Sequence, residues 1–354
     1  MTDQNTREVP RSAVSPPADH ADQALTLLQR VASLRAWLFL IFLVVMFEIW
    51  ARIAFNGTFM FNPYNVQSIA IFAVAPLLLA TGQTFVIISG GIDLSLGFIM
   101  GLAAVVAAHT INWATPVMGP GFAIVFGALV AIAVATIPGT INGLLVARLK
   151  VPPFIGTLGM FGVARGTAFL LAGGTTVPVR GNPVFAAIGN GKIAGVPIIV
   201  LITALFVLTM HYILSQTRFG QHNYAIGASE IAARRAGINI KRHVGRLYIL
   251  SAGCAGLSGV LYSARFAAGA AQAGEPMLLD AVAAVVIGGA SLFGGSGTIL
   301  GTVAGAFVIA VIQYGLVFVN VEPFWQFISV GVVIIVSVLM DQAQRDFSGG
   351  RQSE

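Results

Sequence analysis

The sequence predicts an all-α membrane protein, a polytopic helical bundle of about ten transmembrane segments (8–10). Of its 354 residues, 57% are hydrophobic and only 9% are charged, whereas about a quarter of a typical soluble domain is charged. A membrane-spanning helix needs about 20 mainly apolar residues. Five long stretches hold no Asp, Glu, Lys or Arg: 53–92, 94–147, 193–217, 247–264 and 281–321. The 41 glycines suit membrane helices that approach one another closely.

The chain starts with a polar tail, residues 1–36, that ends in a predicted interfacial helix on the cytoplasmic surface. Its apolar residues recur at helical spacing: Leu25, Leu28, Val31 and Leu34. Such a pattern is typical of a helix that lies on a membrane rather than in it. The first span, 37–55, carries Glu48 and Arg52, which are spaced to form an ion pair on one helix face.

Nine further apolar segments are predicted as spans, at 64–88, 92–110, 121–147, 154–172, 196–214, 247–268, 279–291, 297–319 and 323–340. The connections between them are recognisable by composition. Gly90 and Gly91 interrupt the second and third segments, a Gly/Pro-rich stretch at 173–195 forms the longest outer loop, and a polar stretch at 215–246 forms a cytoplasmic loop. The transmembrane domain therefore covers 37–341, and 342–354 is a second cytoplasmic tail.

Basic residues are distributed unevenly over the predicted loops. With the N-terminus inside, the cytoplasmic segments contain Arg7, Arg11, Arg30, Arg35, Arg148, Lys150, Arg218, Arg234, Arg235, Lys241, Arg242, Arg246, Arg345 and Arg351. Arg52, Arg180, Lys192 and Arg265 lie outside or near the outer face, and Arg165 lies in a span. Because cytoplasmic loops are enriched in basic residues, both termini are predicted to be cytoplasmic. The net charge of +6 then reflects topology, and no nucleic-acid partner is expected.

Two Gly-rich segments resemble each other faintly. Ile88–Gly97 and Ile287–Gly295 are each followed by a Gly/Ala-rich apolar segment. Internal repeats are common in transporter folds, so the pair indicates a possible internal repeat. A chance similarity of Gly-rich helix breaks explains it equally well.

The loop 215–246 carries six basic residues against one acid, Glu230. Within it, Ser229–Gly237 has an acid in the first turn, arginines later and a final glycine, which predicts a short capped helix. Alanines at 232, 233 and 236 leave one side of this helix slim. It could insert into a groove of a cytosolic partner, or it could be a solvated connection whose arginines only fix the topology.

Several segments together resemble the ribose-type sugar ABC transporter permeases. Gly227–Ile238 matches that family's Gly-x-x-Glu-x-Ala-Ala-Arg-x-x-Gly-Ile segment, and Thr84–Gly97 is similar to its Gly-Ile-Asp-Leu-Ser segment. Further matches lie at Gly139–Gly143 with Pro152–Gly159, and at Leu279–Gly289. They occur in the family's order from about residue 64 to Asp341, so jointly they are specific.

The resemblance implies the membrane subunit of a binding-protein-dependent importer in the bacterial inner membrane. Such a permease pairs with a second copy or a related permease in the lipid bilayer, binds a cytosolic ABC ATPase subunit and receives a sugar from a periplasmic solute-binding protein. By this resemblance the ATPase-coupling residues are Gly227, Glu230, Ala232, Ala233, Arg234 and Gly237. The individual sugar does not follow from the sequence.

Asp93 is the only acid between Glu48 and Glu230 and follows two glycines that permit unwound backbone. It is either the N-cap of a helix starting near Leu94 or a gating residue beside the translocation path. The other candidates for the path are Gly90, Gly91, Ser95, Gln83, Asn142 and Gln313. The three amides could equally form ordinary bonds between helices. Asp280 and Glu275 are expected to cap a helix that begins near Met277.

No arrangement typical of an enzyme can be assembled from the sequence. The histidines lack metal-ligand spacing, and the Gly-rich stretch at 288–297 lacks the lysine of a phosphate-binding loop. We therefore expect a transport subunit without a cofactor or metal of its own, with ATP and Mg²⁺ bound by the partner ATPase. The alternative is an ion-coupled secondary transporter, for which Asp93 is the one serious coupling residue.

Overall fold

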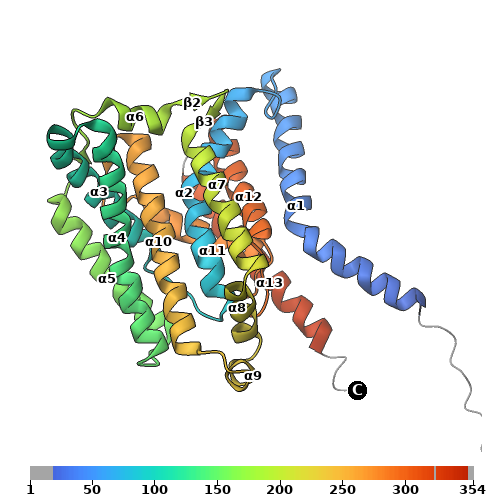
Figure 1. Cartoon of the computed structure of the whole chain (residues 1–354). Helices are drawn as coiled ribbons and strands as arrows, with labels where there is room; N and C mark the ends of the chain where they lie inside the picture. The colour runs from blue at the N-terminus through green and yellow to red at the C-terminus, as the bar shows by residue number, and fades with distance from the viewer. Residues whose placement is uncertain (1–18, 323, 350–354) are drawn as a thin grey trace, which may run out of the picture.

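The chain folds into a bundle of α-helices (Figure 1). The structure is a computed structural model that describes the backbone of residues 19–322 and 324–349 and the side chains of residues 34–322 and 324–339. Eight helices in this described part are long and apolar enough to cross a membrane. They are α1 (Asp19–Phe55, apolar from Leu34), α2 (Pro63–Ile88), α3 (Leu96–Met118), α4 (Pro120–Ala147), α5 (Pro153–Ala172), α7 (Ile198–Gln216), α10 (Ile240–Phe266) and α12 (Ile299–Phe318).

Five further helices and four short strands complete the described part of the bundle. They are α6 (Pro183–Asn190), α8 (Arg218–Ala228), α9 (Glu230–Arg235), α11 (Glu275–Ile287), α13 (Phe324–Gly349), β1 (Val177–Pro178), β2 (Lys192–Ile193), β3 (Val196–Pro197) and β4 (Ala268–Gly269). The strands form two small antiparallel pairs, β1 with β4 and β2 with β3. Figure 1 shows α6, β2 and β3 at one end of the bundle and α8 and α9 at the other.

Each of the ten predicted segments contains a helix, which confirms the fold class. Two of these helices are shorter than a full span: α11 has 13 residues, and the apolar part of α13 covers Phe324–Leu339. The predicted segment 279–291 is wrong at its end, because the chain leaves the helix at Gly288. Hydropathy alone does not separate such half-length helices from spans. The tail before residue 19 and the side chains of the predicted interfacial helix lie outside the described residues.

The two Gly-rich segments interrupt the bundle at corresponding places. We call residues 89–95, between α2 and α3, the first break, and residues 288–298, between α11 and α12, the second break. Gly90 has φ +82° and Gly289 has φ +89°, a region that suits glycine. The breaks touch, because a Cβ added at Gly294 would lie only 3.0 Å from the Gly90 nitrogen. The Gly295 N–H also donates to the carbonyl of Ile88, the residue just before the first break, at 2.9 Å. The similar segments therefore meet in space, while the internal repeat itself stays a prediction.

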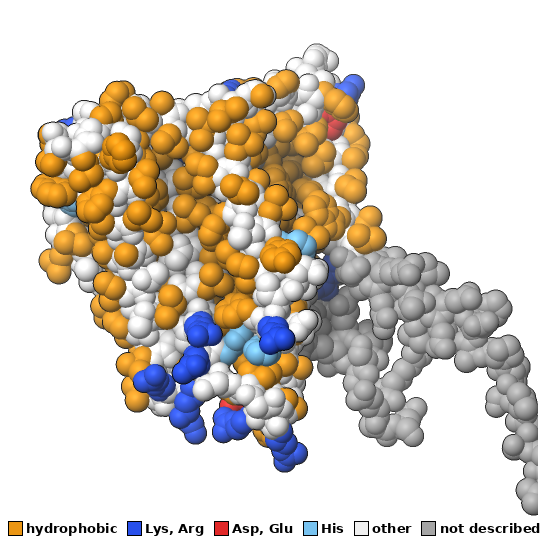
Figure 2. Space-filling view, viewed as in Figure 1, with side chains coloured by type: hydrophobic (Ala, Val, Ile, Leu, Met, Phe, Trp, Pro, Cys, Tyr) orange, Lys and Arg blue, Asp and Glu red, His pale blue; other side chains and the backbone are white. Residues whose placement is uncertain are grey.

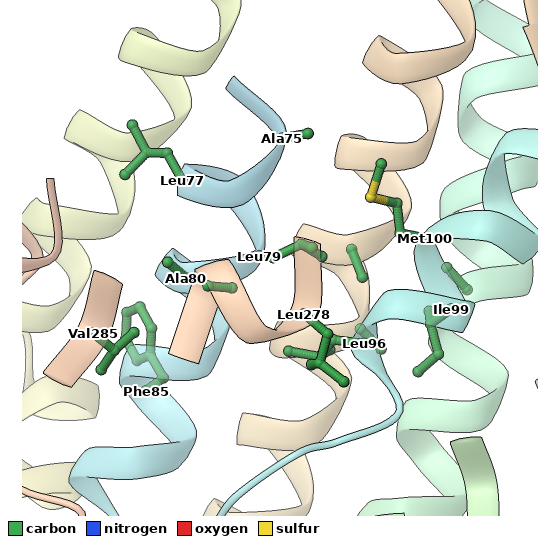
Figure 3. Close-up of a cluster of buried hydrophobic side chains, with 14 of the residues drawn as sticks. Ala75, Leu77, Leu79, Ala80, Phe85, Leu96, Ile99, Met100, Leu278 and Val285 are labelled. Atoms are coloured by element: carbon green, nitrogen blue, oxygen red, sulfur yellow. The ribbon is translucent and has the colours of Figure 1, made fainter. Parts of the chain in front are cut away.

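The core is built from the helices on either side of these breaks. Figure 3 shows Leu79 of α2, Leu96 and Met100 of α3, and Leu278 of α11 gathered in one buried cluster. Helix α10 packs against α2, α3 and α4. Its Cys254 is fully buried, as expected of a small packing residue. The breaks are thus held between closely packed helices.

Surface charge gives the orientation of the bundle. Lys and Arg side chains gather at the end formed by α8 and α9, whereas hydrophobic side chains cover the flank (Figure 2). Since basic residues favour the cytoplasmic side, α8 and α9 lie in the cytoplasm. Helix α13 ends on the same side (Figure 1).

The outer end of α1 contains the predicted ion pair. Arg52 Nε donates to Glu48 Oε1 at 2.7 Å. The other oxygen, Oε2, accepts the backbone N–H groups of Phe59 at 2.8 Å and Met60 at 2.9 Å. Glu48 therefore fixes the outer loop between α1 and α2, which gives this acid a structural role.

Candidate functional site

The predicted short helix in the cytoplasmic loop is present as α9. The Ser229 side chain accepts the Ala232 N–H at 3.2 Å, Arg234 pairs with Glu230 at 2.6 Å, and Gly237 ends the helix at φ +83°. Ile231 is 70% exposed, whereas Ala233 is buried. The helix thus presents an isoleucine and charged side chains to the cytoplasm.

Helix α8 ties α9 to the interior of the bundle. Tyr224 Oη donates to the Gly297 carbonyl at 2.6 Å, and Asn223 Nδ2 donates to the Phe85 carbonyl at 2.9 Å. Burial raises the pKa of the Tyr224 phenol, so its hydroxyl stays a donor. Asn223 is fully buried. Helix α8 therefore binds both the last turn of α2 and the second break.

Gly227, near the end of α8, touches the last residue of α2 and the second break. A Cβ added there would lie 1.8 Å from the Ile88 carbonyl oxygen and 2.5 Å from the Gly295 nitrogen. No side chain fits without pushing three backbone segments apart. The glycine is therefore required for packing, independently of any partner that α9 binds.

A cavity of about 420 Å³ opens between α9 and the first break. Glu230 and Arg234 line it on the side of α9, and Gly90 and Gly91 line it on the side of the break. Lys150, Lys241 and Tyr248 complete its polar lining. The cavity brings two of the six predicted coupling residues, Glu230 and Arg234, to the predicted glycines of the path.

A buried polar cluster, formed by Gln83, Asp93, Ser95 and Asn142, lies beside this break. Asp93 Oδ1 accepts the Ser95 N–H at 3.0 Å and the Ser95 hydroxyl at 2.5 Å, and Asn142 donates to Ser95 Oγ at 2.9 Å. The Gln83 amide, with its nitrogen toward the carbonyl, bonds the Asp93 backbone O at 3.3 Å and N at 3.2 Å. All four side chains are fully buried. Helices α2, α3 and α4 are joined through this cluster.

Helix α3 begins at Leu96, two residues after the predicted start near Leu94. Leu94 and Ser95 form a turn in which Ser95 already has helical dihedral angles. Asp93 Oδ1 accepts the Ser95 N–H two residues on, as an N-cap side chain does, and whether Asp93 also gates the path stays a prediction. The sequence prediction placed the helix start too early, because Leu94 continues the apolar pattern without being helical.

The cluster is incompletely hydrogen-bonded. Within the part of the chain that the structure describes, no partner reaches Asp93 Oδ2, Asn142 Oδ1 or the hydroxyl of Tyr248. Buried polar groups normally have partners, so these atoms are available to water or to a passing polar solute. Tyr248 also lines the cytoplasmic cavity, which places an unpaired hydroxyl at its inner wall.

Gln313 lies apart from the other predicted path residues. Its Nε2 donates to Asp280 Oδ2 at 2.8 Å. Asp280 lies five residues into α11, which begins at Glu275, so the prediction that Asp280 caps this helix is wrong. The pair joins α11 to α12 instead. A local pattern cannot show this contact, because its two residues are 33 positions apart.

Sequence reasoning missed Asn223, Tyr224, Ile231 and Tyr248. Asn223 and Tyr224 lie in a polar loop in which nothing marks them as contacts of α2 and the second break. Ile231 had a detectable signal, since it is the large apolar residue among the charges and alanines of α9. Tyr248 had none, because a tyrosine in an apolar span is ordinary.

Comparison with known proteins places this architecture in a family. A family profile described as the permease component of branched-chain amino acid transport systems matches residues 65–338. The chain is 35% identical to the ribose import permease protein RbsC of Bacillus subtilis, over 81% of this chain and 87% of that protein. It is 34% identical to the fructose import permease protein FrcC of Rhizobium meliloti, over 78% and 76% of the two chains. The galactose/methyl galactoside import permease protein MglC of Haemophilus influenzae is 33% identical, over 85% and 93%.

These matches span the helices that carry the breaks, the cluster and α9. They support an ABC system with ATPase and binding-protein partners over an ion-coupled carrier. Together with the apolar helices, they make the chain a multi-pass protein of the bacterial inner membrane. The chain belongs to the ribose-type family of ABC importer permeases, whose members are the membrane-spanning transport subunits.

Proposed function

We propose that the chain moves a sugar or a similar polyhydroxylated solute inward, using ATP hydrolysed by a separate cytosolic subunit. The relatives named for ribose, fructose and galactose import support this solute class. The observation that carries the mechanism is the attachment of α8 to the last turn of α2, which leads into the first break, and to the second break, through Asn223, Tyr224 and Gly227. A push on α9 thereby reaches the interior of the bundle.

Helix α9 is the contact for the ATPase in this proposal. Exposed Ile231 enters a groove of the partner, as an anchor residue of a docked helix does, and the Glu230–Arg234 pair lies at the rim. Ala232, which is exposed, allows close approach. Buried Ala233 packs α9 against the rest of this chain. Gly237, at positive φ, ends the helix.

Motion of α9 changes the region between the cytoplasmic cavity and the polar cluster. Gly90 and Gly91 line the cavity, and Asp93 follows them in the same unwound segment. If α8 pulls on Ile88 and Gly295, the first break shifts and the unpaired Asp93, Asn142 and Tyr248 groups become accessible to solute. Alternating access of this kind needs two discrete arrangements biased by nucleotide.

The finer assembly is also a proposal. Two permease chains, identical or related, would bind two ATPase subunits on the cytoplasmic side and one periplasmic solute-binding protein on the outer side. ATP and Mg²⁺ would be bound by the ATPase subunits, and this chain would carry no cofactor of its own.

The decisive test is co-purification of the tagged chain from its native membrane in mild detergent, followed by ATPase assay and sugar uptake in vesicles. We expect an ATPase subunit to be recovered with the wild type and with Ile193→Glu, a matched change at an exposed isoleucine near the outer end. Ile231→Glu should release that subunit. A stable chain that binds no ATPase and takes up sugar with an ion gradient would refute the proposal.

A further inference from the structure

The outer half of the bundle contains a second cavity, far from α8 and α9. It has a volume of about 460 Å³ and adjoins an open groove of about 810 Å³. Both are lined by Tyr262, Phe266, Pro276, Met277 and Phe327. The cavity is lined by residues of α2, α7, α10, α11, α12 and α13, and ligand sites commonly lie between the helices of a bundle in this way.

The lining combines aromatic rings with hydrogen-bonding groups. The rings of Tyr262 and Phe266 lie 4.6 Å apart between centroids on one wall, tilted by 43° to each other. Asp280 and Gln313 lie on another wall, hydrogen-bonded to each other. Gln326 and Arg265 complete the polar lining of the cavity. Ligand pockets are typically mostly apolar with a few convergent polar groups.

Asp280 is a buried carboxyl group whose hydrogen bonds within the described residues are incomplete. It is 7% exposed, and a carboxyl group among membrane helices is costly unless it has partners. Among the described residues, Gln313 is its one hydrogen-bonding partner, at Oδ2. Its Oδ1 accepts no hydrogen bond from that part of the chain, and the residue lines the cavity. An acceptor that faces a cavity in this way fits a ligand that carries hydroxyl groups.

We propose that this cavity is a solute-binding site on the outer half of the path, with Asp280 and Gln313 binding hydroxyls and Tyr262 and Phe266 contacting the apolar face of a sugar ring. This rests on the proposed transport function and adds the site that selects its solute. A lipid chain would fill the apolar part of the cavity but would leave Asp280 Oδ1 unpaired. A neutral polyhydroxylated ring satisfies both parts.

The site is also mechanically connected to the cytoplasmic end. Asp280 lies on α11, whose 13 residues form a rod of about 20 Å. That helix ends at the second break, which Gly227 and Tyr224 of α8 contact. A shift of the second break would therefore move Asp280 against Gln313 on α12, which couples release of solute to motion of α9.

The first experiment labels cysteines introduced into a chain whose native cysteine is buried. The chain has a single cysteine, Cys254, which is fully buried and gives little background labelling. Met277→Cys adds a thiol to the cavity wall, and Ala187→Cys adds a matched thiol on exposed outer surface of α6. The assembled transporter in proteoliposomes is labelled with a membrane-impermeant maleimide, with and without ribose, fructose or galactose.

We expect at least one of these sugars to slow labelling of Met277→Cys severalfold and none to affect Ala187→Cys. If all three sugars leave Met277→Cys labelling unchanged in a transporter that takes up one of them, the cavity holds lipid or a partner and the proposal is overturned. If the wild type takes up no sugar with ATP, the proposed function fails instead, so the two failures are distinguishable.

The second experiment separates binding from folding. Gln313→Leu should lower sugar uptake about tenfold, the effect of about 1.4 kcal/mol for one lost hydrogen bond, while ATPase activity stimulated by the binding protein is kept. Gln67→Leu, which removes hydrogen bonds with Gly195 and Lys192 outside the cavity, serves as a matched control and should transport like the wild type. Uptake by Gln313→Leu equal to the control, with normal ATPase activity, would overturn the proposal. Loss of both activities in Gln313→Leu would signal misfolding. Tyr262→Leu is therefore measured in parallel, and its sugar uptake is likewise compared with its ATPase activity.

Discussion

The two breaks differ in composition, although they occupy corresponding places and touch each other. The first break contains a carboxylate, Asp93, and is buried from Gly91 inward except for partly exposed Ile92 and Leu94. The second break contains no acid, is more exposed, and has four glycines at positive φ: Gly289, Gly294, Gly295 and Gly297. One break therefore supplies buried polar chemistry, and the other supplies a pliable backbone that α8 can contact.

This difference suggests that the two breaks have different roles in transport. A pliable segment can transmit displacement at small energetic cost, because glycine has few steric limits. A buried carboxylate with incomplete hydrogen bonding responds strongly to small displacements, because electrostatic interactions are strong at low dielectric. Helix α8 contacts the second break directly and the last turn of α2, from which the first break continues, so changes at its contact residues should reveal which break limits transport.

The largest effect is expected at Gly227. Gly227→Ala forces a Cβ against the Ile88 carbonyl and Gly295, which should destabilise the chain by about 1–3 kcal/mol and abolish coupled transport. Thermal unfolding in detergent and ATP-driven uptake measure the two effects. Gly253→Ala is the matched control, since a Cβ there meets no atom within 4 Å. Equal behaviour of the two variants would contradict the contact between α8 and the breaks.

The next effect concerns the chemistry of the first break. Asp93→Leu leaves the Ser95 N–H and the Ser95 hydroxyl without their acceptor, which should cost about 1–3 kcal/mol of unfolding free energy. Asp93→Asn keeps an acceptor at Oδ1 and should fold nearly as the wild type. Comparing their denaturation with their uptake separates the structural from the gating role. If Asp93→Asn is stable but does not transport, the charge itself is required.

A smaller effect is expected where α8 binds the second break. Tyr224→Phe removes the hydrogen bond to the Gly297 carbonyl, worth about 1 kcal/mol, without changing shape. We expect ATP hydrolysis to continue while the number of sugar molecules carried per ATP falls. Tyr212→Phe, at an exposed position of α7, is the control. An unchanged transport ratio in Tyr224→Phe would assign coupling to the first break alone.

Much of the fold follows from the sequence, because burial in lipid demands long apolar helices. All ten segments were recognisable by hydropathy, and α9 by its cap, its charges and Gly237. Helix length was less predictable, since α11 ends at a glycine pair inside an apolar run. The apolar composition is the same whether the chain crosses the whole membrane or half of it.

The candidate site was only partly predictable, because contacts distant in sequence have no local signal. Gln83, Asp93 and Asn142 were each noticed as polar residues in apolar segments, but their meeting depends on how α2, α3 and α4 pack. The same applies to Asp280, whose partner lies on α12. Tyr224 and Asn223 were not predicted because they lie in a polar loop, where polar residues are expected and do not indicate a buried contact.

The smallest effect is expected at the exposed ion pair of α9. Glu230→Gln removes the pairing with Arg234 at 2.6 Å, but both side chains are more than half exposed, so the stability change should be only about 0.3–0.5 kcal/mol. A clear loss of ATPase binding in this variant, at unchanged unfolding temperature, would mean that Glu230 contacts the partner directly. Glu322→Gln, at an exposed outer position, controls for net charge. If both variants bind the ATPase like the wild type, Ile231 and the shape of α9 make the contact with the ATPase. The charged residues of this helix would then only help to set the membrane topology.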